Sequence, residues 1–94
     1  MAFALPLPQT WASQGWKVKI RDRERLEPPH ATLLNRTRAW RWNLRLSAFM
    51  DVDPPPGEVP DELVEIIKQH RETLCTEWDR MYPLNPIAQE VDDD

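Results

Sequence analysis

The chain has 94 residues, of which 40% are hydrophobic, so it can bury one modest core and we expect a single domain. Its single cysteine excludes an intramolecular disulfide and a multi-thiolate metal site, as is typical of a reducing compartment. The formal net charge of −4 hides an asymmetry, because residues 16–45 carry nine basic and three acidic groups, a charge of +6, and the remainder carries −10. A local basic face that binds an anionic partner is therefore compatible with the acidic total.

Residues 1–15 are predicted to form an extended N-terminal arm, because Pro6 and Pro8 forbid a helix and donate no hydrogen bond to a sheet. The arm is mildly apolar but has no basic leader, so we expect no secretory signal. No uncharged apolar run approaches the roughly 18–20 residues that a membrane span needs. We therefore expect a cytoplasmic protein that makes no contact with a membrane.

Two short strands are predicted next. Trp16, Val18 and Ile20 alternate with basic residues, which is the pattern of a strand with one buried side. A polar loop follows and ends in two prolines, which hold the chain extended before His30. Residues 31–34, with the sequence ATLL, are predicted to form the second strand.

The clearest pattern in the sequence covers residues 40–51, where every even position is apolar. This alternation predicts a third, long strand with one face on the core. The core positions that it implies are Trp40, Trp42, Leu44, Leu46, Ala48 and Met50.

A stiff, proline-rich linker separates this strand from a predicted amphipathic helix of about five turns, which begins at Pro60 and ends at Tyr82. Apolar positions recur in it at three- and four-residue spacing. Residues 16–82 are therefore expected to form one α+β domain, a three-stranded antiparallel meander packed against one long C-terminal helix, and residues 83–94 an acidic tail. The predicted inner face of the helix consists of Leu63, Ile66, Ile67, His70, Leu74, Trp78 and Met81.

Two features are candidates for function. His30, fixed by the prolines before it, is the candidate catalytic residue, a general acid or base; the alternative is an exposed or hydrogen-bonded corner histidine. The basic strand faces are the candidate binding site for an anionic partner, with the alternative of a solvated face that pairs with an acidic helix of a neighbour or with Asp92–Asp94. The binding candidates are Lys17, Lys19, Arg21, Arg41, Asn43 and Arg45.

Other chemistry has no support in the sequence. The tryptophans alternate onto the side opposite the basic residues and are poor candidates for base stacking. There is no HxH or HExxH element, no nucleophile elbow and no Gly-rich phosphate loop, so we expect neither a metal nor a cofactor. Whether the protein is an enzyme is left open.

The order of motifs resembles a family of short bacterial proteins of unknown function that carry a Pro-Pro-His-x-His element and close with a helix. The residues that carry the resemblance are Pro28, Pro29 and His30, and later His70, Arg71, Leu74 and Trp78. The element's second histidine is replaced here by Thr32, which weakens any role that depends on a histidine pair. Genes of that family often lie beside another small gene, as toxin–antitoxin pairs do.

Three functions follow as hypotheses. The preferred one is a small interaction protein, one component of a toxin–antitoxin-like or phage-defence module, which binds a protein partner or a second copy of itself. The second is an RNA-directed toxin in which His30 transfers protons and Arg41 and Arg45 stabilise the developing charge. The third is RNA or DNA binding without chemistry, through the same basic face.

Overall fold

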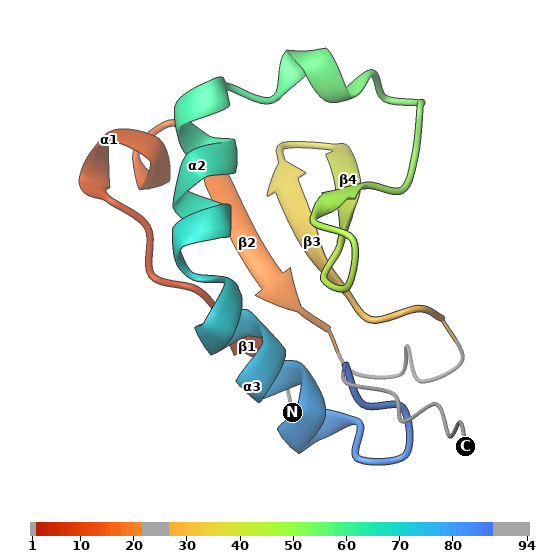
Figure 1. Ribbon diagram of the computed structural model, residues 1–94. Coiled ribbons are helices and arrows are strands. Elements are labelled where there is room, and N and C mark those ends of the chain that lie inside the picture. Colours follow the sequence, from red (N-terminus) through yellow and green to blue (C-terminus); the bar gives the residue numbers. More distant parts are fainter. Residues whose placement is uncertain (1, 22–26, 88–94) are drawn as a thin grey trace.

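The chain folds into an antiparallel sheet with a helical layer along one side, and its class is α+β (Figure 1). The structure is a computed structural model that describes residues 2–21 and 27–87; part of the predicted polar loop and most of the predicted acidic tail lie outside these residues. The strands are β1 (Phe3–Ala4), β2 (Trp16–Ile20), β3 (His30–Asn35), β4 (Arg38–Asn43) and β5 (Ala48–Phe49). The helices are α1 (Gln9–Ala12), α2 (Asp61–Gln69) and α3 (Arg71–Met81), with a 3₁₀ turn, η1, at Pro56–Glu58.

The sheet is a meander with strand order β1-β2-β3-β4-β5, in which every neighbouring pair is antiparallel. The antiparallel meander was predicted correctly, but the prediction of three strands was wrong. Part of the expected N-terminal arm joins the sheet as β1, where Phe3 pairs with Ile20 and Ala4 with Lys19. A further part of the arm forms the short helix α1.

The predicted long third strand is wrong beyond Asn43. The side-chain oxygen of Asn43 accepts hydrogen bonds from the backbone N–H groups of Arg45 and Leu46, at 2.8 and 2.9 Å, and so closes a turn. Ser47 has a φ of 52° in this turn, and the chain returns antiparallel as β5. The turn breaks the alternation, because Leu44 stays fully buried while Leu46 is 74% exposed.

The predicted C-terminal helix is present, but it is divided into α2 and α3 at His70. That residue has φ −105° and ψ 21°, and its backbone N–H is shared between the carbonyls of Ile66 and Ile67. The imidazole Nδ1 also lies 2.9 Å from the Ile66 carbonyl oxygen. His70 is exposed, so its predicted place on the inner face of the helix is wrong.

The core lies between the sheet and the two C-terminal helices, which run end to end alongside β2 (Figure 1). Leu63 and Ile67 of α2 and Leu74 and Trp78 of α3 are all fully buried and supply the helical side. The prediction that the strand tryptophans belong to the core is confirmed. The sheet contributes Trp16, Val18, Ile20, Ala31, Leu33, Trp40 and Trp42.

Candidate functional site

The predicted basic residues of β2 and β4 do fall on one surface of the sheet. Lys19 pairs with Thr32 of β3, and Thr32 pairs with Arg41 of β4, so these three residues form one row across the sheet. Residues opposite each other in an antiparallel ladder point to the same face. Since Trp16 and Val18 point into the core, Lys17 and Lys19 point away from the helical layer.

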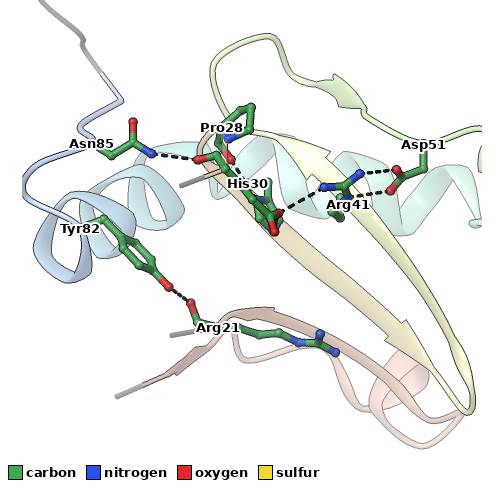
Figure 2. A network of polar contacts seen from close by, with 8 residues as sticks. Arg21, Pro28, His30, Arg41, Asp51, Tyr82 and Asn85 are labelled. Atoms are coloured by element: carbon green, nitrogen blue, oxygen red, sulfur yellow. Dashed lines mark hydrogen bonds and ion pairs between the residues drawn. The ribbon is translucent and has the colours of Figure 1, made fainter. Parts of the chain in front are cut away.

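Arg41 lies on this surface but is engaged by two carboxylates. Its Nε and Nη2 donate to the two oxygens of Asp51 at 3.0 and 2.6 Å (Figure 2). Its Nη1 donates to Oε1 of Glu27 at 3.2 Å. Hydrogen bonds from Arg41 hold the pKa of the Asp51 carboxyl below its ordinary value, against the opposing effect of burial. The same bonds raise the pKa of Arg41. The guanidinium is therefore largely neutralised within the molecule.

Arg45 and Asn43 are also occupied by contacts within the chain. The Arg45 guanidinium donates to the backbone oxygens of Pro86 and Ile87 at 2.7 and 3.0 Å, and to the side-chain oxygen of Asn85 at 3.3 Å. The Asn43 side chain closes the turn after β4. Both residues therefore hold the end of β4 in place, and neither shares the row of Lys19 and Arg41.

Lys17, Lys19 and Arg21 are the candidates that remain accessible. Lys17 and Arg21 are exposed and Lys19 is half-buried. The ion pairs among the described residues involve none of the three side chains. The backbone carbonyl of Arg21 accepts a hydrogen bond from the Tyr82 hydroxyl, which ties the end of β2 to the end of α3 (Figure 2).

His30 begins β3 and is fully buried. Its Nδ1 lies 2.9 Å from the Pro28 carbonyl oxygen, which can only accept, so Nδ1 carries the proton. Its Nε2 lies 3.7 Å from Oε1 of Glu27, and its ring centroid lies 5.7 Å from that of Trp78. The catalytic role of His30 stays a prediction, and the burial of the imidazole does not favour contact with a substrate.

The residues around His30 that the sequence pattern did not single out are Glu27, Asp51 and Asn85. Glu27 lies close to both His30 and Arg41, and its backbone carbonyl accepts a 2.8 Å hydrogen bond from Nδ2 of Asn85. Asn85 lies in the segment after α3, whose backbone also accepts from Trp78 Nε1 at 2.7 Å. No local signal marks these residues, because the contacts of Arg41 with Glu27 and Asp51, and of Asn85 with Glu27, join positions ten or more residues apart.

No group of three or more potential metal ligands lies together in the part of the chain that the structure describes. None of the described helices is long and apolar enough to cross a membrane. Comparisons with protein-family models, with curated proteins and with solved structures found no match to this chain. The resemblance carried by Pro28–His30 and the C-terminal helix therefore stays a prediction.

The pairing of Arg41 with Asp51 predicts a specific acid sensitivity. Replacing Asp51 by asparagine should lower the free energy of unfolding at neutral pH by about 0.5–1 kcal/mol, a modest amount because Arg41 is partly exposed. A carboxyl whose folded pKa is lowered stabilises the fold above its unfolded pKa, about 3.9, and this contribution is lost as the pH falls through the folded value. The difference between wild type and Asp51→Asn should therefore be constant above about pH 5 and shrink as the pH falls further.

Urea unfolding across this pH range measures the difference. Glu65→Gln is the matched control, because Glu65 is an exposed carboxylate 3.9 Å from Lys68 on one helix surface. Its effect should stay near zero throughout, as for most exposed pairs. A difference between wild type and Asp51→Asn that does not change with pH would contradict the expected role of the ion pair.

Proposed function

We propose that the protein is a small interaction protein that binds an acidic surface of a protein partner through the lysine face, which consists of Lys17 and Lys19 on the outer side of β2. The observation that supports this most directly is that these ammonium groups lie on the side of the sheet opposite the helical layer, without an ion pair among the described residues. Arg41 and Arg45, by contrast, are satisfied inside the molecule.

The distribution of charge over the two layers supports the same proposal. Residues 61–81, which form the helical layer, contain six acidic and three basic residues. The lysine face lies on the opposite side of the fold, so the helical side of the molecule is acidic and the lysine face is basic. Such a distribution orients an acidic partner toward the sheet and speeds association at low salt.

The biological setting that we propose is a two-protein module of the toxin–antitoxin or phage-defence type. Its support is the resemblance in Pro28–His30 and in the segment from His70 to Trp78. A second copy of the chain is an alternative partner, because its acidic helical layer complements the lysine face. The RNA-directed alternatives have weaker support, since His30 is buried and the two arginines assigned to charge stabilisation are engaged.

A capture experiment tests the proposal. Wild type, the double variant Lys17→Glu with Lys19→Glu, and Lys68→Glu are immobilised and exposed to a lysate at low and high salt, and the bound proteins and nucleic acids are identified. Lys68 is an exposed lysine of α2, so its variant is the matched control for charge. We expect a specific protein that is retained by wild type and Lys68→Glu, and lost by the double variant and at high salt.

Two outcomes would count against the proposal. Equal capture by all three proteins would show that the lysine face is not used. Binding that nuclease treatment abolishes would instead assign the face to nucleic acid, with the steep salt dependence of phosphate contacts. Light scattering at low and high salt distinguishes a foreign partner from a second copy.

A further inference from the structure

A groove lies beside the lysine face, between the N-terminal arm and β2. Its volume is about 350 Å³, at the lower end of the range for ligand sites. Six of its eight lining residues are apolar, two are lysines, and none is acidic. The lining residues are Ala4, Leu5, Leu7, Ala12, Trp16, Lys17, Val18 and Lys19.

The groove exists because the pairing of the arm with β2 stops early. After the two pairs of β1, the last bond between the segments is from Leu5 N–H to the Val18 carbonyl, at 2.9 Å. Continuing the register would bring Leu7 opposite Trp16. The prolines on both sides of Leu7 have no N–H to donate, and the chain turns into α1 instead. The arm therefore leaves β2 and opens a space at its edge.

The lining combines two kinds of recognition. Leu5, Trp16 and Val18 are core residues with only 5%, 8% and 1% exposure, so they hold the base of the groove in place. The accessible apolar side chains of the lining are Ala4, Leu7 and Ala12. Lys17 and Lys19 add positive charge on one side, and no carboxylate of the lining neutralises them. A ligand that buries an apolar group here also lies next to two ammonium groups, which need an acceptor or a negative charge. A ligand with an apolar group next to a carboxylate meets both requirements.

We propose that this groove binds a short segment of a partner protein in which apolar side chains stand next to carboxylates. The proposal rests on the proposed function and deepens it, because it adds an apolar anchor to the acidic surface that the lysine face attracts. Charge attracts and orients such a segment, while burial of the apolar side chain gives most of the affinity. An extended segment suits the site, since its side chains alternate in direction as those of β2 do.

Fluorescence anisotropy with short labelled peptides tests the groove. The probe is an alternating leucine–aspartate peptide, and the comparison peptides alternate serine with aspartate and leucine with lysine. We expect the leucine–aspartate peptide to bind at least about tenfold more tightly than either, because only this peptide supplies both an apolar group and a carboxylate. Equal binding of the serine–aspartate peptide would overturn the apolar part of the proposal.

The decisive variant is Ala12→Glu, which places a carboxylate in the lining at an exposed position of α1. Its control is Ser13→Glu, an exposed neighbour outside the lining. Binding of the leucine–aspartate peptide should fall at least about tenfold in Ala12→Glu and stay unchanged in Ser13→Glu. Because both positions are exposed, thermal unfolding should show that both variants fold, and equal binding by the two would overturn the proposal.

The same variants separate this inference from the proposed function. If the double lysine variant loses the captured partner but Ala12→Glu keeps it, the lysine face is used and the groove is not. If neither loses it, both proposals fail. Two further probes, decanoate and single-stranded RNA, test other occupants; binding of either in place of the peptide, with the same loss in Ala12→Glu, would overturn a protein segment as the ligand.

Discussion

Replacing Trp78 by alanine is expected to lower the free energy of unfolding by about 3–5 kcal/mol, a large part of the stability of a small domain. Trp78 is fully buried on α3, and its ring centroid lies 4.1 Å from that of Tyr82. Its indole N–H donates to the Asn85 backbone carbonyl at 2.7 Å. The substitution therefore leaves a large cavity and also removes one of the hydrogen bonds that hold the segment after the helix.

Two further variants separate these contributions. Trp78→Phe keeps an aromatic ring beside Tyr82 but removes the indole donor, and should cost about 1–2 kcal/mol. Thr76→Ala, at an exposed position of the same helix, should change the stability by less than about 0.5 kcal/mol. Urea unfolding followed by far-ultraviolet circular dichroism measures all three without relying on tryptophan emission. A Trp78→Ala variant as stable as Thr76→Ala would contradict the packing described above.

The elements predicted correctly are those whose pattern reports burial directly. In β2 the alternation of Trp16, Val18 and Ile20 with charged residues matches the observed burial, because a two-residue period separates the faces of a strand. Leu63, Ile67, Leu74 and Trp78 of the helices were found in the same way from a three- and four-residue period. Both patterns arise because each strand or helix buries one hydrophobic side against the core.

The misplaced boundaries depend on hydrogen bonds that no apolar pattern contains. The alternation continues through Leu46, yet the strand ends at Asn43. The side-chain oxygen of Asn43 accepts from the next backbone N–H groups and forms a turn, so these groups do not pair with a neighbouring strand. Pro6 and Pro8 predict an arm that is neither helical nor paired in a sheet, but they did not exclude α1, which begins directly after Pro8. Nor did they exclude β1, which pairs with β2 before Pro6 is reached.

For the candidate site, too, the sequence pattern predicts which side of a strand a residue lies on, but not which residues it contacts. The basic residues of β2 and β4 could be placed on one face from alternation alone. The alternation does not show which of these residues stay available, because that depends on partners elsewhere in the chain. Arg41 is neutralised by Asp51, and the Arg45 guanidinium is hydrogen-bonded to neutral oxygens of residues 85–87. A positive run in a sequence therefore overstates the charge that a partner meets at the surface.

Replacing His30 by alanine is the second change with a large expected effect, a loss of about 2–4 kcal/mol in the free energy of unfolding. The imidazole is fully buried against Trp78, and its Nδ1 donates to the Pro28 carbonyl, which fixes the corner into β3. Alanine removes both the packing and the donor. His70→Ala is the matched control, because His70 is exposed between α2 and α3, and it should cost less than about 0.5 kcal/mol.

The His30 variant also decides between a structural and a catalytic role for this residue. A structural histidine acts through stability, so any loss of partner capture in His30→Ala should follow the fraction of unfolded protein and recover at lower temperature or in a stabilising osmolyte. A catalytic histidine would act differently: expression of wild type would arrest growth, and His30→Ala would abolish the arrest while urea unfolding stayed unchanged. Because burial in this fold keeps the imidazole from solvent, the first pattern is the one that we expect.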